Sequence, residues 1–216
     1  MEFLRRAHIR PARLGILPGT FNPITVAHLA LAEAALPLVD EVVFVLPRVF
    51  PHKDYSGPGF RERLELVAEA TGEEPAYSIA SSRRGLFLEI AGECREAYGT
   101  DVRLTFLCGR DAAERIVSWD YGREGALEEM FRSFDLLVAS REGDYSPPRE
   151  LANSIAPLPL GGQFDLVSAT EVRRRIARNE SWKHLVPPKI GSTTRTVSKL
   201  RKWYSPTKPT DNSGET

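Results

Sequence analysis

A ten-residue segment near the start of the chain gathers the groups that bind phosphate: a glycine, hydroxyls and an imidazole. It reads GTFNPITVAH, from Gly19 to His28. Gly19 lets the backbone approach a ligand closely, and a helix starting within the segment would present unpaired N–H groups to an anion. Thr25 and His28 are three residues apart, so they share one face of such a helix and could both donate to phosphate oxygens. The segment predicts an anion site, although a capped helix with a surface histidine would have the same spacing.

A second segment, residues 168–176 (SATEVRRRI), has the same kind of chemistry. Ser168 and Glu171 form a capping-box pattern, which predicts that a helix starts here. The hydroxyls of Ser168 and Thr170 would then lie beside the exposed N–H groups of that helix. Arg173, in its first turn, adds a cation that can bind two oxygens at once. We expect another anion site here, and we expect the two arginines that follow to be solvated.

Four further residues follow predicted strands or helices at places that a nucleotide could reach. Lys53 ends a Pro-His-Lys segment and could extend a charge to a phosphate, or be a surface lysine after a proline turn. Asp111 follows Cys-Gly and could accept from a ribose or a base, or cap a helix. Trp119 suits stacking on a flat ligand or packing in the core. Arg141 is a candidate to hold a phosphate or to position a loop.

Strand-like and helix-like patterns alternate along the chain. The strand-like runs are short and mostly apolar, and lie at residues 13–18, 41–46, 77–80, 102–107, 135–139 and 164–167. The helix-like runs lie at residues 26–36, 60–70, 86–98, 111–117, 127–131, 170–179 and 189–204. This alternation predicts an α/β fold with a doubly wound parallel sheet and a C-terminal helical segment. Residues 147–162 are rich in proline and are expected to form a loop.

Ligands of such sheets bind beyond the carboxyl ends of the strands, at the point where the strand order reverses. The loops after the strands at 13–18 and 102–107 are therefore the places where a ligand is expected. Both loops carry candidate residues described above.

Composition bounds the function. The 216 residues include 29 Lys or Arg, 29 Asp or Glu and two Cys. Zero net charge argues against wholesale nucleic-acid binding, and two cysteines rule out a disulfide scaffold and favour a reduced, cytoplasmic setting. The most apolar stretch, residues 42–46, is too short to span a bilayer, so no membrane partner is expected.

Charge is distributed unevenly along the chain. Residues 1–167 hold 18 basic and 25 acidic side chains, whereas residues 168–204 hold 10 and 2. We predict an N-terminal extension at 1–12 and one domain at 13–204, with a basic helical part at 168–204. The last twelve residues, 205–216, have no apolar side chain to bury and are expected to be a disordered tail. The basic part is either a solvated helical surface or a lobe that faces an anionic substrate.

These segments together resemble the nicotinate/nicotinamide mononucleotide adenylyltransferases of the nucleotidyltransferase superfamily. The resemblance covers about residues 14–190. GTFNPITVAHL is similar to the superfamily's [HT]xGH segment, PHK and CGRD to shorter family segments, and SATEVRRRI to the segment that grips the ATP phosphates. LLVASREG and LVP also match in order. The chain has Thr25 where many bacterial members have a first histidine, and Ala169 where the family usually has a second serine. The resemblance implies a Rossmann-like fold.

The reaction that the resemblance implies joins ATP and a pyridine mononucleotide, with release of pyrophosphate. The 5′-phosphate of the mononucleotide attacks the α-phosphorus of ATP in line, and catalysis consists of positioning and charge stabilisation. Mg²⁺ is expected to bind mainly through the ATP phosphates, without a carboxylate cage. The residues implied at the ATP site are Gly19, Thr20, Phe21, Asn22, Thr25, His28, Gly109, Asp111, Ser168, Thr170 and Arg173. Those implied at the mononucleotide are Lys53, Trp119 and Arg141, and those implied in catalysis are His28, Thr25, Lys53 and Arg173.

Other readings remain open at the level of sequence. A sibling enzyme, phosphopantetheine adenylyltransferase or a cytidylyltransferase, would share the phosphate-binding residues and differ in the acceptor pocket. A non-catalytic nucleotide-binding regulator would keep the fold without turnover. An RNA-binding module would use residues 168–204, which lack interleaved aromatic residues. The choice between nicotinate and nicotinamide mononucleotide and the oligomeric state are also left open.

Overall fold

The computed structural model describes residues 1–205 apart from 50–54, 56, 120, 123 and 140–144. Its centre is a seven-stranded sheet in the order β1-β4-β3-β2-β5-β6-β7. All neighbouring strands are parallel except β1 and β4. The strands are β1 (Glu2–Arg5), β2 (Arg13–Pro18), β3 (Glu41–Pro47), β4 (Tyr77–Ser82), β5 (Arg103–Gly109), β6 (Asp135–Ala139) and β7 (Ile155–Leu158). The order from β4 to β7 reverses at β2 and β5, as in a Rossmann-like doubly wound sheet.

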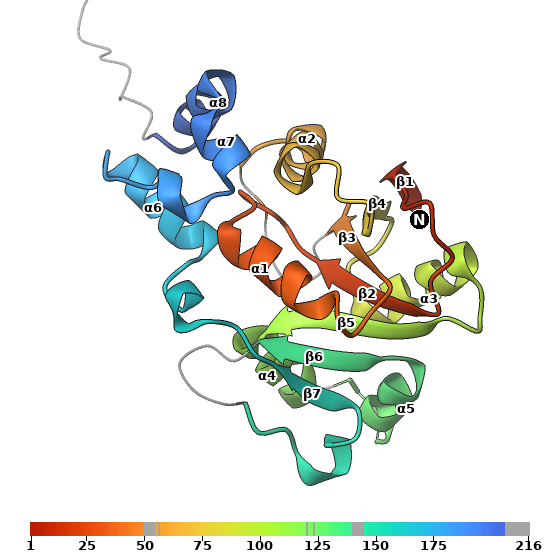
Figure 1. Ribbon diagram of the computed structural model, residues 1–216. Coiled ribbons are helices and arrows are strands. Elements are labelled where there is room, and N and C mark those ends of the chain that lie inside the picture. The colour runs from red at the N-terminus through yellow and green to blue at the C-terminus, as the bar shows by residue number, and fades with distance from the viewer. Residues whose placement is uncertain (50–54, 56, 120, 123, 140–144, 206–216) are drawn as a thin grey trace, which may run out of the picture.

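Helices cover both faces of the sheet (Figure 1). They are α1 (Val26–Ala35), α2 (Phe60–Thr71), α3 (Phe87–Tyr98), α4 (Arg110–Ser118), α5 (Ala126–Ser133), α6 (Ala169–Ala177), α7 (Pro188–Ser192) and α8 (Thr194–Tyr204). Alternate residues of β3 show the two-sided burial: Phe44 belongs to the cluster that contains α1 and α8, and Val43 to the cluster that contains α3 and α5. All seven residues of β3 are buried, which explains its continuous apolar sequence. The α/β prediction is therefore confirmed.

The last strand differs from the prediction. The strand expected at 164–167 is wrong, because residues 162–164 form a 3-10 helix. The strand lies instead at β7, inside the segment 147–162 that was expected to be a loop. Ile155 and Leu158 are buried, and β7 pairs with β6 at the edge of the sheet. An edge strand tolerates Pro157, whose missing N–H is not needed for pairing on the open side.

The C-terminal helical segment is also divided differently. The single helix expected at 189–204 is two helices, α7 and α8, joined at Thr193. Thr193 is extended, with φ −73° and ψ 114°. Together with α6, these helices lie at one end of the molecule, beside α2 and next to the start of α1 (Figure 1).

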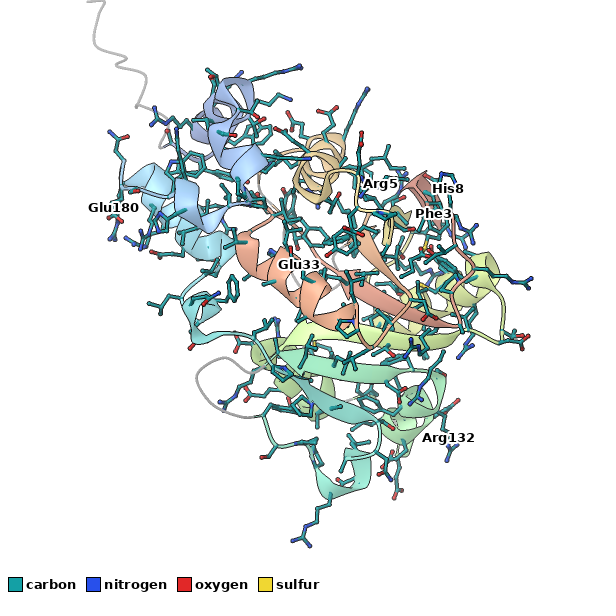
Figure 2. All side chains as sticks on the ribbon, viewed as in Figure 1. Phe3, Arg5, His8, Glu33, Arg132 and Glu180 are labelled. Atoms are coloured by element: carbon teal, nitrogen blue, oxygen red, sulfur yellow. The ribbon has the colours of Figure 1, made fainter. Side chains whose placement is uncertain are left out.

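The N-terminal extension adds an edge strand that the sequence patterns did not reveal. β1 runs antiparallel to β4, with Glu2 opposite Ser81. Figure 2 shows Phe3 and Arg5 beside β4, far from Glu180 at the end of α6. The main-chain N–H of Ala7 donates to the Ser78 hydroxyl at 2.8 Å.

Within the described part of the chain, no helix combines the length and apolarity that crossing a bilayer requires.

Candidate active site

The site lies where β2 and β5 run side by side. These strands are parallel neighbours, with Ile16 opposite Phe106, and they flank the reversal in strand order. The loop after β2 and the start of α4 after β5 therefore lie at the same carboxyl edge of the sheet. This is the position at which α/β sheets bind ligands.

His28 is held by the residue that begins its own helix. Thr25 is the N-cap of α1 and is fully buried. Its main-chain N–H donates to Nδ1 of His28 at 3.0 Å, and its Oγ1 lies 2.8 Å from the same nitrogen. Since a backbone N–H can only donate, Nδ1 accepts and the imidazole carries its proton on Nε2. His28 thus has an Nε2–H donor for an anion, while Thr25 orients the ring.

Phe21 supports the same imidazole from the side. Its ring is buried and meets the His28 ring edge-on, with centroids 5.2 Å apart. The backbone of Phe21 has φ 47°, a conformation that non-glycine residues rarely adopt. A Cβ atom on Gly19 would lie 2.7 Å from Cζ of Phe21, so this position has no room for a side chain. The N–H of Gly19 donates to the Val45 carbonyl at 3.0 Å, so Gly19 provides space for Phe21 and joins the loop to β3.

The second predicted anion segment meets the first. Nη1 of Arg173, on α6, donates to the main-chain carbonyl of Asn22 at 2.6 Å. Its Nη2 donates to Oγ1 of Thr170 at 3.0 Å. Ser168 caps α6, since its Oγ accepts from the N–H of Glu171 at 3.0 Å. Two segments about 150 residues apart therefore contribute an imidazole, a guanidinium and hydroxyls to one edge of the sheet.

The two arginines after Arg173 are engaged with a carboxylate instead. Arg174 and Arg175 both donate to Oε1 of Glu171, at 2.7 and 2.6 Å. These hydrogen bonds lower the pKa of Glu171 to about 2. Arg174 also pairs with Glu180, which lies at the far end of α6 (Figure 2). Both arginines are partly exposed, and further hydrogen bonds from them go to Glu180 and to the main-chain carbonyl of Ser181.

Sequence reasoning missed Arg63. Its side chain is buried, and its Nη1 donates to the main-chain carbonyl of Thr20 at 2.7 Å. The guanidinium lies over the ring of Tyr55, 4.6 Å from the centroid, and burial lowers its pKa. The signal was present in the sequence: Arg63 shares the buried face of α2 with Leu66, Val67 and Ala70, which is an unusual place for a charge.

Tyr204 was also missed. This residue ends α8, and its hydroxyl donates to Oδ1 of Asn22. Burial raises its pKa, so the phenol remains a hydrogen-bond donor at neutral pH. The short C-terminal segment KWY gives no sign of such a contact, because the separation of 182 residues is closed only by the fold.

The candidates after β5 lie at the start and end of α4. Gly109 is the N-cap of α4 and Asp111 is exposed in its first turn, so Asp111 is not the cap that its sequence position allowed. Trp119 follows α4 and is 52% exposed, which excludes the core-packing alternative. A hollow of about 490 Å³ lies along α4, and its lining residues are Arg110, Glu114, Val117, Ser118, Tyr145, Ser146 and Pro148. Lys53 and Arg141 lie outside the described residues.

The donor set of the site suits phosphate rather than a metal ion. Hydroxyl, imidazole N–H and guanidinium groups all donate hydrogen bonds. Among the residues that the structure describes, no three His, Cys, Asp or Glu side chains are grouped so as to hold a metal ion. The site therefore fits a divalent cation that arrives on a nucleotide and keeps phosphate and water ligands, the coordination that Mg²⁺ prefers.

Comparison with solved structures shows the same fold elsewhere. The structure titled "Plasmodium falciparum nicotinic acid mononucleotide adenylyltransferase complexed with NaAD" superposes with a TM-score of 0.64. The match covers 88% of this chain and 95% of that one at 16% sequence identity. At this identity the likeness concerns the fold alone.

Comparison of sequences shows the family. The family profile described as Cytidylyltransferase-like matches residues 16–175. A protein of Moorella thermoacetica named "Probable nicotinate-nucleotide adenylyltransferase" is 30% identical over 198 residues, which cover 84% of this chain and 88% of the relative. A protein of the same name from Citrifermentans bemidjiense is 34% identical over 160 residues, 70% of each chain. The resemblance predicted from the motifs is confirmed, and the chain belongs to the cytidylyltransferase-like family, among the nicotinate-nucleotide adenylyltransferases.

Proposed function

We propose that this enzyme transfers the adenylyl group of ATP to nicotinate mononucleotide and releases pyrophosphate. The observation that carries the proposal is the contact between Arg173 and the Asn22 carbonyl, which brings both predicted anion segments to one site. The names of the relatives support nicotinate as the pyridine substrate, and family membership supports the reaction type.

The transfer is a single displacement at the α-phosphorus. An oxygen of the mononucleotide 5′-phosphate forms a bond to the α-phosphorus of ATP, and the bond from that phosphorus to the bridging oxygen breaks. The electron pair leaves with pyrophosphate. A phosphate monoester is already largely ionised near neutral pH, so the attack requires no strong general base. The protein contributes alignment and stabilisation of negative charge.

His28 acts on the α-phosphate in this proposal. Its Nε2–H donates to a non-bridging oxygen as charge develops there. Thr25 is buried and bonded to Nδ1, so we assign it to positioning His28 rather than to holding the triphosphate itself. A donor of this kind lowers the barrier by roughly 3 kcal/mol.

The remaining phosphates are assigned to the start of α6. Ser168, Thr170 and Arg173 would bind the β- and γ-phosphates, and their hydrogen bonds would stabilise the leaving pyrophosphate. When bound, Mg²⁺ supplies further neutralisation of the phosphate charge, held through the phosphates that these residues bind. This arrangement uses the guanidinium as a two-point donor.

The other predicted residues are assigned by their places around the sheet edge. The loop from Gly19 to Asn22 would border the adenosine, with Thr20 and Phe21 supplying backbone. Gly109 and Asp111 would face the ribose or base. Trp119, exposed at the end of α4, would stack on the pyridine ring. Lys53 and Arg141 would bind the mononucleotide phosphate, and these two assignments rest on the sequence alone.

An end-point assay tests the function directly. The full chain is incubated with MgATP and nicotinate mononucleotide, and the dinucleotide and pyrophosphate are quantified by chromatography and a coupled phosphate assay. Parallel reactions contain nicotinamide mononucleotide, phosphopantetheine, or CTP in place of ATP. We expect equal amounts of dinucleotide and pyrophosphate, with the highest kcat/KM for nicotinate mononucleotide. Absence of product with both pyridine mononucleotides would overturn the proposal.

A further inference from the structure

Asn22 is fixed by two helices that are distant in sequence. It is 8% exposed. Its main-chain carbonyl accepts from Arg173 on α6, and its side-chain Oδ1 accepts from the Tyr204 hydroxyl on α8. Its side-chain oxygen therefore makes a contact within the protein, at a position that the resemblance places in the ATP site.

Gly57 lies against the same Asn22 amide. The backbone of Gly57 has φ +143°, and a Cβ atom there would lie 3.0 Å from Nδ2 of Asn22. The amide is thus enclosed between the loop before α2 and the end of α8. A shift of Tyr204 or of Gly57 would therefore also shift the backbone of Asn22.

Helix α8 is anchored independently of Tyr204. Thr196, near its start, donates to both carboxylate oxygens of Glu69 on α2, at 3.1 and 3.0 Å. Leu200 is fully buried, and α8 packs against α6 and α7. Because the burial of Leu200 and the packing against α6 and α7 hold the helix without the Thr196 hydrogen bond, the Tyr204 hydroxyl has a defined place from which to hold Asn22.

We propose that Tyr204 is a positioning residue for the adenylyl transfer. Its hydroxyl, through Asn22, holds the loop at residues 19–25, here called the nucleotide loop, to α8. We call this hydrogen bond between Tyr204 and Asn22 the latch. Asn22 is three residues before Thr25, which orients His28, and its carbonyl holds Arg173. Tyr204 therefore acts on both sides of the site without touching substrate. The inference rests on the proposed function for its effect on rate, because in-line transfer is sensitive to small displacements of the bound groups.

Two variants that each lose one hydroxyl on α8 test the latch. Tyr204→Phe breaks the contact with Asn22, and Thr196→Val breaks the contact with Glu69 at the other end of the same helix. Losing one hydrogen bond of about 1 kcal/mol corresponds to roughly a fivefold effect. We expect Tyr204→Phe to lower kcat about fivefold with a smaller change in KM for ATP. We expect Thr196→Val to lower the melting temperature while kcat stays within twofold of wild type.

Asn22→Ala breaks the same hydrogen bond from the other side. In the Asn22→Ala background, Tyr204→Phe is expected to have no further effect on kcat, since both substitutions remove one interaction. Full additivity of the two effects, or an equal loss of kcat in Thr196→Val, would overturn the latch and leave only a structural role for Tyr204.

Hydrogen exchange in the absence of nucleotides separates the latch from the reaction. Peptides covering residues 19–28 are expected to exchange several-fold faster in Tyr204→Phe than in wild type, and at the wild-type rate in Thr196→Val. Unchanged exchange in Tyr204→Phe refutes the latch, even in an active enzyme. If wild type makes no dinucleotide, the proposed function fails, and faster exchange in Tyr204→Phe still supports the hydrogen bond as the restraint on the loop.

Discussion

The imidazole of His28 is prepared for one task by its neighbours. The main-chain N–H and the Oγ1 of Thr25 both lie within hydrogen-bond distance of Nδ1. The ring of Phe21 packs against the imidazole in an edge-to-face arrangement. The proton is thereby placed on Nε2 before a substrate arrives. Such preorganisation stabilises transition-state charge without a reorganisation cost at the moment of reaction.

Replacing this imidazole tests its role. His28→Ala is expected to lower kcat by about two to three decades, because one donor to the developing charge is lost. The free energy of unfolding should fall by only about 1 kcal/mol, because His28 is partly buried but the Thr25 N–H at the start of α1 loses its acceptor. Steady-state kinetics and thermal unfolding give the two readouts. Glu33→Ala, an exposed position on the same helix (Figure 2), is the matched control and should retain wild-type kcat. A His28→Ala kcat within twofold of wild type would remove His28 from the mechanism.

Gly19 is expected to be intolerant of even one methyl group. In Gly19→Ala the new Cβ would meet the Phe21 ring at 2.7 Å, and the ring that supports His28 would have to move. We expect a loss of roughly 1–3 kcal/mol in the free energy of unfolding and a fall in kcat of about tenfold or more. Urea unfolding and kinetics measure these effects.

The control for Gly19 is a glycine in open space. A Cβ on Gly92, within α3, would meet nothing within 4 Å. Gly92→Ala is therefore expected to stabilise the protein by roughly 0.5–1 kcal/mol, because alanine is the better helix former, and to leave kcat unchanged. Wild-type stability and rate in Gly19→Ala would contradict the steric argument.

At the level of the elements, the start of α6 combines a cap, a cation and an ion-paired network. Glu171 serves this helix twice: its N–H is capped by Ser168, and its carboxylate binds Arg174 and Arg175. The network holds the first turn in shape while Arg173 reaches the nucleotide loop. In the proposed reaction, this helix start would be preorganised for phosphate.

The Glu171 network predicts a pH dependence of stability. The pKa of Glu171 falls from 4.5 to about 2 on folding, so its contribution is present above about pH 4.5 and is lost as the pH falls toward 2. Urea unfolding of wild type and Glu171→Gln should therefore show a stability difference at pH 6 that shrinks steadily below pH 4.5. A difference that is constant from pH 6 to pH 3 would show that the carboxylate charge contributes nothing.

Across the whole molecule, the candidate site lies at the carboxyl ends of the strands, and a cluster of buried polar side chains lies at their amino ends. The carboxyl edge holds the nucleotide loop. At the amino ends of the strands, Glu41 begins β3 and is fully buried. Its Oε1 accepts hydrogen bonds from Ser78 on β4 and Tyr98 on α3, both at 2.5 Å. Ser78 in turn accepts from the N–H of Ala7, so this cluster connects the N-terminal strand to the sheet.

Burial raises the pKa of Glu41 above 4.5. A raised pKa means that this contribution to stability is present below pH 4.5 and is lost as the pH rises through the folded value. Glu41→Gln removes the buried charge, so its stability relative to wild type should improve as the pH rises from 4 to 8. Urea unfolding at pH 4, 6 and 8 measures the difference. A difference that stays constant or moves against the variant would show that Glu41 does not titrate in this way.

Local patterns predicted most of the sheet and the start of α6. The runs at β2, β3, β5 and β6 are apolar enough to indicate buried strands, and Ser168 marks the start of α6 by the capping rule. The patterns failed at β7 and β1. β7 contains Pro157, and β1 has no regular alternation, so both are recognised only by the strand each pairs with.

The sequence by itself determined which groups could bind phosphate, since a capping box, a glycine turn and a TxxH spacing are local properties of the chain. Only the tertiary structure decided which of these groups lie in the same site and which instead hold a neighbouring side chain in place. Arg173 and Tyr204 meet Asn22 across 151 and 182 residues, and Thr25 is buried against His28. Such contacts depend on how whole helices pack on the sheet, and no pattern of neighbouring residues records that packing.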